Sequence, residues 1–247
     1  MGSSGLRKGE NAAGPFWAIV QADLKGLFRS RITYGWVLAA VFIQVIRTLG
    51  SRGTVTVSAV VTSGLGDFVY IWALVIIGLS ASSVSSEAGE LADSVMSKSV
   101  TRLDYILAKF ASRISYTIVT FSLVTGLLVG LGVDLEVGDY NSLGLVTAVL
   151  LVALALVTLT TLGVGLSVAL SNSVVAIVVL LVLWYAMTVL FQVVGLGVLS
   201  PGSLLGMLPD LAKGVWTSGE WESALALAAV SAASGVLASA YFYLKDI

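Results

Sequence analysis

The sequence predicts an all-α polytopic membrane protein, and three observations support this fold class. Hydrophobic residues fill 57% of the 247 positions and charged residues only 11%, whereas a soluble domain has roughly 25% charged residues. Apolar runs long enough to cross about 30 Å of hydrocarbon recur along the chain. Basic residues are spread unevenly over the segments between these runs. No soluble domain interrupts the series, so we expect a single transmembrane domain over residues 1–247.

Six transmembrane helices are expected from the apolar runs. They cover residues 32–49, 68–84, 114–133, 143–170, 174–194 and 224–244. The fourth run is the longest, and we expect it to tilt or break near Gly163 and Gly165. The segment 51–66 could form either a loop or a short re-entrant piece.

The basic residues orient these spans. Most of them lie before the first span, between the second and third, or after the sixth, and these are Arg7, Lys8, Lys25, Arg29, Arg31, Lys98, Arg102, Lys109, Arg113 and Lys245. The remainder are Arg47, Arg52 and Lys213. By the positive-inside rule, we expect a multi-pass protein of the plasma membrane with both termini in the cytoplasm.

The longest charged stretch, residues 85–113, is the one substantial cytoplasmic loop in this arrangement. Apolar side chains recur at helical spacing from Ala88 to Met96, which predicts a short amphipathic helix. A second helix should begin at Thr101, because "TRLD" has the spacing of a capping box with Asp in place of Glu or Gln. The amphipathic helix could lie on lipid or form a docking surface for a cytosolic partner.

A further amphipathic helix is expected over residues 15–31, directly before the first span. Phe16, Val20 and Leu24 begin an apolar stripe, and Lys25 lies on the opposite face. The simplest interpretation is an interfacial elbow helix that runs along the cytoplasmic membrane surface.

The composition excludes several function classes. The chain has no Cys and no His, which rules out disulfides, thiolate and imidazole metal sites, and a Ser-His triad. No Asp or Glu lies within the six predicted spans, which argues against an ion-coupled carrier without deciding the matter. The P-loop pattern is absent, so the chain cannot hydrolyse ATP by that route. We expect no catalytic residues, no metal site, no cofactor bound by this chain and no nucleic-acid partner.

The segment "EAGELADSVMSKSVTRLDYILAKF", residues 87–110, is similar to the stretch after the second span in ABC-2 type permeases of ABC transporters. The matching positions are Glu87, Gly89, Leu91, Ser97, Lys98, Thr101, Arg102, Tyr105, Lys109 and Phe110. Ser99 stands where that family usually has Pro, and Ala108 where it usually has Gly. The ending "YFYLKDI" and the segment "ADLKGLFRSRITYGW" also resemble this family, so the resemblance extends over nearly the whole chain.

This resemblance implies the permease subunit of an ATP-driven exporter. Two such subunits, identical or homologous, would pair within membrane lipid, and each would contact a separate ABC ATPase subunit that holds ATP and magnesium. The predicted docking and coupling residues are Glu87, Glu90, Leu91, Asp93, Val95, Met96, Lys98, Arg102 and Asp104. The resemblance also implies a re-entrant element over residues 195–223.

Four polar residues are candidates for the substrate pathway. Tyr185, Thr188 and Gln192 share one face of the fifth span, and Gln44 lies in the first. The family's first, second and fifth spans line a central cleft, although interhelical hydrogen bonding explains these residues equally well. Neutral polar and aliphatic groups favour an amphiphile, lipid, drug or peptide over a small ion. A secondary carrier or channel, and a non-transporting membrane anchor or assembly factor, remain alternatives.

Overall fold

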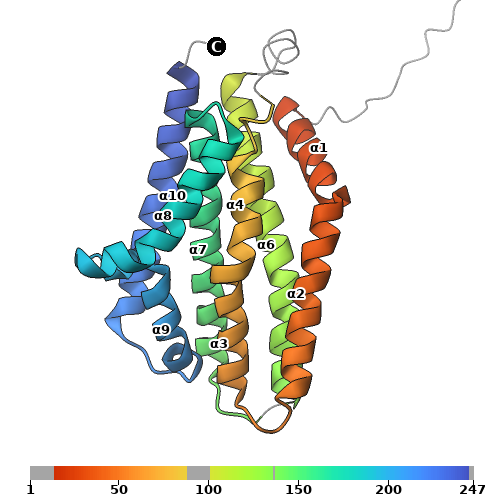
Figure 1. Cartoon of the computed structure of the whole chain (residues 1–247), viewed down its shortest axis with the longest axis vertical. Helices are drawn as coiled ribbons and strands as arrows, with labels where there is room; N and C mark the ends of the chain where they lie inside the picture. Colours follow the sequence, from red (N-terminus) through yellow and green to blue (C-terminus); the bar gives the residue numbers. More distant parts are fainter. Residues whose placement is uncertain (1–13, 88–100, 136, 245–247) are drawn as a thin grey trace, which may run out of the picture.

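The computed structural model describes residues 14–87, 101–135 and 137–244. These residues form helices joined by turns, with one isolated β-bridge between Thr56 and Val137. The elements, shown in Figure 1, are α1 (Pro15–Arg29), α2 (Arg31–Gly50), α3 (Val57–Asp67), the π-helix η1 (Phe68–Trp72), α4 (Ala73–Ala81), α6 (Arg102–Leu135), α7 (Ser142–Ala169), α8 (Ser173–Val193), the 3₁₀-helix η2 (Gly197–Leu199), α9 (Pro201–Ala212) and α10 (Ser218–Leu244).

Several helices are long and apolar enough to cross a membrane, which indicates a helical membrane protein. Within the described part of the chain there are five: Arg31–Ser51, Val57–Ala81, Arg102–Leu135, Ser142–Ala169 and Ser218–Leu244. The other predicted span corresponds to α8, of which the part described with its side chains includes the apolar stretch Ser173–Ala186. The chain also turns away from the bundle axis at the end of α8 (Figure 1). The all-α class is therefore confirmed, and a sixth crossing remains a prediction.

The helices form an elongated bundle with two distinct ends (Figure 1). The start of α6 and the end of α10 lie with α1 at one end, which we call the α1 end. The turns after α2 and after α6 lie at the opposite end, nearer α9, which we call the α9 end. This grouping is the one expected if the basic segments before the first span and after the second share one side of the membrane.

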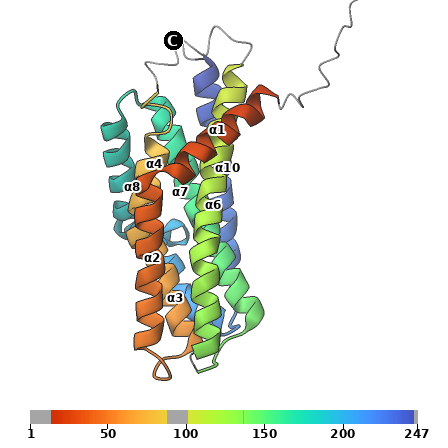
Figure 2. The same ribbon diagram turned by 90° about the vertical axis from the view of Figure 1, so that its right-hand side faces the viewer.

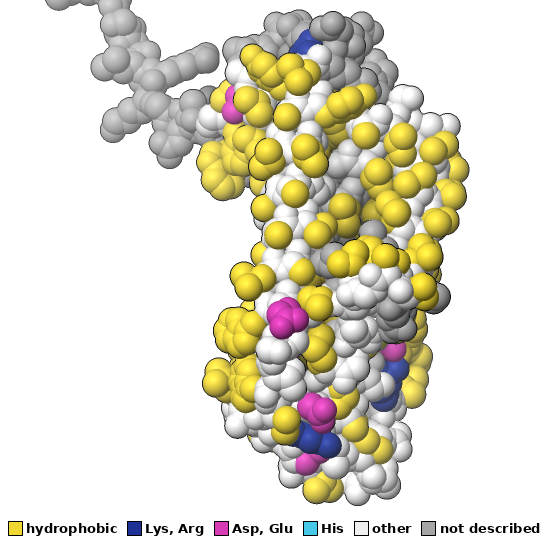
Figure 3. All heavy atoms as spheres, turned by 90° about the vertical axis from the view of Figure 1, so that its left-hand side faces the viewer, with side chains coloured by type: hydrophobic (Ala, Val, Ile, Leu, Met, Phe, Trp, Pro, Cys, Tyr) yellow, Lys and Arg dark blue, Asp and Glu magenta, His cyan; other side chains and the backbone are white. Residues whose placement is uncertain are grey.

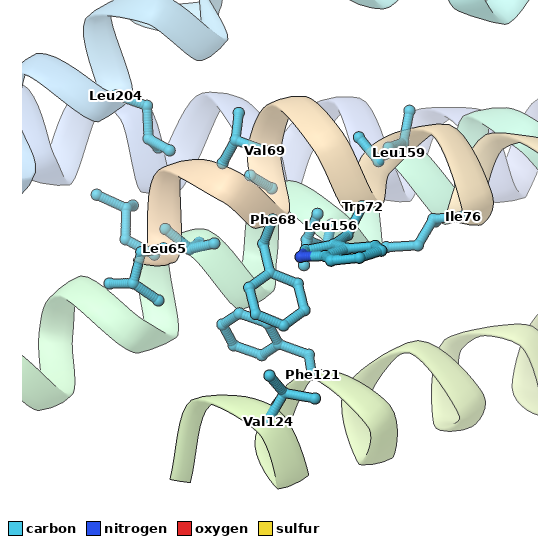
Figure 4. Close-up of a cluster of buried hydrophobic side chains, with 14 of the residues drawn as sticks. Leu65, Phe68, Val69, Trp72, Ile76, Phe121, Val124, Leu156, Leu159 and Leu204 are labelled. Atoms are coloured by element: carbon cyan, nitrogen blue, oxygen red, sulfur yellow. The ribbon is translucent and has the colours of Figure 1, made fainter. Parts of the chain in front are cut away.

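The continuous path of α3, η1 and α4 lies in the middle of the packed core. Phe68 of η1 meets Phe121 of α6 edge to face, with ring centroids 4.8 Å apart. Figure 4 shows the same path surrounded by Val124 of α6, Leu156 of α7 and Leu204 of α9. Because lipid tails are as apolar as these side chains, close van der Waals packing holds such helices together in a bilayer.

The predicted limits of the second span were wrong. The span begins at Val57 and ends at Ala81, so segment 51–66 contains a turn followed by the first part of the span. Within this part of the helix, Thr62 Oγ1 donates to the Ser58 carbonyl at 2.8 Å, so the hydroxyl is satisfied by its own helix. Residues 82–87, which include the predicted end, form turns.

α7 runs unbroken past the two glycines at which we expected a break. A Cβ atom at Gly163 would lie 2.0 Å from Ser80 Oγ of α4, and one at Gly165 would lie 3.0 Å from Ser234 Oγ of α10. The glycines therefore allow neighbouring helices to approach closely, a common use of small residues in membranes.

Only Ser30 separates α1 from α2, and its backbone is extended with φ −67° and ψ 135°. Thr33 Oγ1 donates to the Leu27 carbonyl at 2.7 Å and so links the two helices across this joint. Figure 2 shows α1 lying obliquely across one end of the bundle. The predicted helix over residues 15–31 is present, while its position on a membrane surface remains a prediction.

The connection over residues 195–223 contains η2 and α9. The 12 residues of α9 extend about 18 Å, which is too short to cross about 30 Å of hydrocarbon. Leu208 and Leu211 of α9 are fully buried, and the Asn141 amide donates to the Ala212 carbonyl at 2.8 Å. This short, packed helix is compatible with the predicted re-entrant element, whose depth in the membrane remains a prediction.

The face shown in Figure 3 carries many apolar side chains and few charged ones, most of them toward its lower end. Leu225, Val236 and Leu237 of α10 are each about 70% exposed. Exposed apolar patches of this extent are rare on soluble monomers, so this surface is suited to contact with lipid.

Candidate functional site

Four charged side chains meet at the α1 end of the bundle. Lys109 of α6 is 3% exposed, and its Nζ donates to Glu87 Oε1 at 2.6 Å and to Asp23 Oδ1 at 3.1 Å. Arg113, one helical turn further along α6, donates from Nη2 to the same Asp23 oxygen at 3.4 Å. We call these four residues the charged junction. Two acidic groups and two basic groups balance one another within it.

Hydroxyl groups complete the junction. Tyr105 donates to Glu87 Oε2 at 2.7 Å, and Ser112 donates to Asp23 Oδ2. The Tyr105 ring stacks on Phe242 of α10, with centroids 5.9 Å apart and planes 25° apart. The junction and its neighbours therefore connect α1, the turn after α4, α6 and α10.

The helical repeat explains why these α6 side chains meet. Tyr105, Lys109 and Ser112 are four and three residues apart, so they share one face of the helix. On α1, Asp23 lies between the buried positions Val20 and Leu27 and is carried with them toward the bundle. A lysine in this position must be paired, because removing a charge from water costs several kcal/mol.

The predicted coupling residues fall partly within the described chain. Glu87 belongs to the charged junction. Arg102 and Asp104 lie in the first turn of α6, where the Asp104 amide donates to Thr101 Oγ1 at 3.1 Å, which confirms the predicted capping spacing. The others, Glu90, Leu91, Asp93, Val95, Met96 and Lys98, fall within residues 88–100, outside the described residues.

Sequence reasoning missed part of the junction. It assigned Lys109 only to a family motif and gave Asp23 and Arg113 no role as site residues. A usable signal was present: Lys109 and Arg113 stand four residues apart on a helix that enters the bilayer, and such cations need counter-charges. Asp23 is the single acidic residue of the segment 15–31 and was the natural candidate.

A groove of about 590 Å³ lies at the α9 end, between the α3–η1 path and α9. We call it the α3–α9 groove. Its walls combine hydroxyl and charged groups with apolar side chains, and it is lined by Thr56, Ser58, Ala59, Thr62, Ser63, Gly66, Asp67, Tyr70, Ile71, Leu205, Pro209 and Lys213.

Asp67 brings a carboxylate to this groove from the end of α3. Arg47 Nη2 contacts its Oδ2 at 2.7 Å, and Gln44 Nε2 donates to the same oxygen at 3.2 Å. Gln44 is fully buried. This predicted pathway residue is therefore hydrogen-bonded to Asp67, a residue that lines the groove.

The π-helix η1 forms another part of the groove wall. A π-turn pairs residues i and i+5 and so disturbs the regular α-helical bonding of its carbonyls. Two of these carbonyls accept hydrogen bonds from α8: Trp184 Nε1 donates to the Val69 carbonyl at 2.9 Å, and the Tyr185 hydroxyl donates to the Tyr70 carbonyl. Tyr185, also a predicted pathway residue, is thus bonded to a groove residue.

The structure relates two of the pathway candidates to one site. Gln44 and Tyr185 come from different helices, and each donates a hydrogen bond to a residue that lines the α3–α9 groove: Gln44 to Asp67, and Tyr185 to Tyr70. The side chains of Thr188 and Gln192 lie outside the described part of α8. A role of any of the four in transport remains a prediction.

Asp139, in the turn between α6 and α7, anchors the start of α3. Its carboxylate accepts from the Ser58 amide at 2.9 Å and from the Ser58 hydroxyl at 2.6 Å. Burial opposes ionisation, but these bonds, the Thr56 hydroxyl and the charge of Lys213 together hold the pKa of the Asp139 carboxyl below its ordinary value. Lys213 Nζ lies 3.8 Å from Asp139 and its side chain is 48% exposed. Such a long, exposed pair is weak.

No protein-family model and no curated protein matches this chain. Within the described residues, no group of three or more Asp and Glu side chains is placed to hold a metal ion. Among the described residues, charged side chains gather in the charged junction at the α1 end and in the α3–α9 groove at the α9 end.

Proposed function

We propose that this chain is the permease subunit of an ATP-driven exporter of the ABC-2 type. Its substrate would be an amphiphilic, lipid-like, drug or peptide molecule. In this proposal six helices cross the plasma membrane, both termini lie in the cytoplasm, and two permease subunits form the pathway. A separate ATPase subunit binds ATP and magnesium and docks on the segment 88–100.

The environment of Lys109 is the observation that carries the proposal. This buried lysine pairs at 2.6 Å with Glu87 and at 3.1 Å with Asp23. Glu87 directly precedes segment 88–100 in the sequence, so the segment proposed to dock the ATPase follows a residue of the charged junction. Glu87 and Lys109 are also two positions of the family-like motif, and their contact gives both a physical role.

Force applied to the segment 88–100 would have a short route into the spans. Glu87 is joined to α6 through Lys109, and Lys109 is joined to α1 through Asp23. α1 continues into α2 through the single residue Ser30. Closure of the ATPase dimer would then shift α1, α2 and α6 together, since tightly packed elements move as bodies instead of deforming continuously.

The test is to co-express the chain with an ATPase encoded beside it, purify the complex, and measure its composition and ATP hydrolysis. We expect two copies of each subunit and no hydrolysis by the chain alone. The double reversal Glu90→Lys with Asp93→Lys should weaken ATPase binding while membrane expression stays near normal. An ion pair in contact with solvent contributes at most about 1 kcal/mol, so the two changes are combined.

A matched control reverses two exposed acidic residues at the opposite end of the bundle, Asp210→Lys with Glu222→Lys. This control should leave the complex and its ATP hydrolysis unchanged. Equal effects of the two double variants would contradict docking on the segment 88–100. ATP hydrolysis by the isolated, contaminant-free chain would contradict the need for a partner subunit.

A further inference from the structure

The α3–α9 groove contains polar groups with unused bonding capacity. Both partners of Asp67 contact Oδ2, and within the described residues no donor contacts Oδ1. Tyr70 is 38% exposed, and among the described residues the Lys213 ammonium has its 3.8 Å pair with Asp139 as its one ion pair. In a membrane-embedded bundle such groups need water or a ligand, because hydrocarbon offers them no partner.

The charges around the groove cancel in pairs. Arg47 compensates Asp67 from behind, at 2.7 Å, and Asp139 compensates Lys213. The groove therefore has no net charge, although it presents a carboxylate oxygen and an ammonium at separate places on its wall. This pattern suits a ligand that is neutral overall and carries both signs locally.

Part of the groove wall is apolar. Ile71 of η1 and Leu205 and Pro209 of α9 line the groove together with the polar groups. A ligand with an apolar tail could lie against these side chains while its polar head meets the charged groups. Ligand sites commonly combine a mainly apolar lining with a few placed polar groups.

We infer that the α3–α9 groove binds an amphiphilic lipid with a zwitterionic headgroup. Its primary ammonium donates to Asp67 Oδ1, an anionic phosphate oxygen accepts from Lys213, and its tail packs on Ile71, Leu205 and Pro209. Binding itself does not require the ATPase. That the bound lipid is the exported substrate rests on the proposed function.

Headgroups of a single sign fit this site less well. An anionic headgroup would be attracted to Lys213 but repelled by the Asp67 carboxylate. A cationic headgroup would be attracted to Asp67 but repelled by Lys213. A zwitterion whose ammonium is fully methylated has no N–H to donate to Asp67. The inference therefore orders three lipids: ethanolamine above choline, and both zwitterions above glycerol, whose phosphate makes the headgroup anionic.

The glycines of the second span supply a way to fill the groove. Gly66 lines the groove, and a Cβ atom built there would sit in ordinary contact with Leu205 at 3.9 Å. Gly66→Leu would therefore fit its first carbon and extend into the groove space. Gly78, on α4 of the same span, would place its Cβ within 4 Å of nothing. Gly78→Leu is thus a matched control, and both changes raise helix propensity.

The test uses the whole chain, without an ATPase, in detergent micelles. Lysophosphatidylethanolamine, lysophosphatidylcholine and lysophosphatidylglycerol are titrated separately, and bound lipid is measured by native mass spectrometry. We expect the ethanolamine lipid to bind about tenfold more tightly than the choline lipid, the factor expected for one hydrogen bond to a charged group. Gly66→Leu should abolish this binding, and Gly78→Leu should leave it unchanged.

Two further variants test the headgroup contacts. Lys213→Gln should weaken both zwitterionic lipids several-fold, whereas Lys25→Gln at the opposite end of the bundle should not. Asp67→Asn should remove the preference for ethanolamine over choline. Because that change also disturbs the pair with Arg47, its melting temperature is measured in parallel. If it fails to fold, Gly66→Leu and Lys213→Gln decide.

Equal affinity for the three lipids, or equal losses in Gly66→Leu and Gly78→Leu, would overturn the inference. The outcome separates it from the proposed function. Selective lipid binding without any coupling to an ATPase would support the groove and refute the permease proposal. ATP-coupled activity together with lipid binding that the groove variants leave unchanged would support the permease proposal and refute the groove as the lipid site.

Discussion

Replacing Lys109 by Met keeps an unbranched side chain but removes the positive charge from the centre of the charged junction. Asp23 and Glu87 then lose partners at 3.1 and 2.6 Å. Removing one partner of a buried ion pair costs about 3–5 kcal/mol. Arg113 still contacts Asp23, and the Glu87 side chain is 37% exposed. We therefore expect the low end of this range, about 3 kcal/mol.

The loss is measured as a lower melting temperature in detergent, followed by tryptophan fluorescence. For chains of this size, 1 kcal/mol corresponds to roughly 2–4 °C, so we expect Lys109→Met to melt about 6–12 °C below the parent protein. The control is Lys25→Met. Lys25 is exposed on α1 and has no ion pair among the described residues, so its replacement should change the melting temperature by at most about 2 °C.

A second variant distinguishes lost charge balance from lost packing. Combining Lys109→Met with Glu87→Gln removes one charge of each sign and keeps the pair between Asp23 and Arg113. If an uncompensated carboxylate causes the loss, this charge-balanced double variant should melt above Lys109→Met. The reasoning is refuted if Lys109→Met melts at the same temperature as the Lys25→Met control, or if the double variant is no more stable than the single one.

Three other outcomes are expected. Gly144→Ala would bring a methyl carbon within 2.0 Å of an α9 backbone carbonyl. We expect it to lower the free energy of unfolding, measured by chemical denaturation, by about 1–3 kcal/mol. The control Gly130→Ala has open space around it and should be neutral or stabilising. The lowered pKa of Asp139 contributes stability that is fully present above its ordinary pKa of about 4 and is lost as the pH falls through the folded-state pKa. Asp139→Asn should therefore reduce the fall in melting temperature between pH 6 and pH 3. The same fall in the variant and in the parent protein would contradict the role of the serine contacts. The chain has no Cys, so Thr54→Cys should react with an impermeant maleimide only from outside and Lys245→Cys only from the cytoplasm, and labelling of both from one side would exclude the proposed topology.

Local patterns predicted the elements whose causes are local. The helix over residues 15–31 and the start of α6 follow from apolar spacing and from one capping sequence, which involve residues within a turn or two of each other. The Thr101–Asp104 contact is an example, since both of its partners lie in the quoted tetrapeptide.

The errors arose where distant residues decide the structure. Segment 51–66 was expected to form a loop or a short re-entrant piece. In the fold, Asp139 caps this helix start from another part of the chain, and Thr62 bonds back to its own helix. Gly163 similarly suggested a break, but its real neighbour is Ser80 of α4.

The candidate sites were harder to predict than the spans. The charged junction joins Asp23 to Lys109, and the α3–α9 groove joins Asp67 to Lys213. Helical periodicity gives the face of one helix but not the helix that will cover it. The pairing of these residues is set by tertiary packing, so sequence patterns could identify single members but not the sets.

The π-turn of η1 has a consequence for insertions and deletions in the second span. A single π-turn is equivalent to one extra residue within an α-helix, and each residue rotates an α-helix by roughly 100°. Deleting one residue from Phe68–Trp72 would therefore rotate α4 against α3 and turn Ser80 away from Gly163. A bilayer tolerates a length change of one residue through a small tilt. The number of residues in this span is thus constrained more strictly by the rotation of α4 relative to α3 than by the thickness of the membrane.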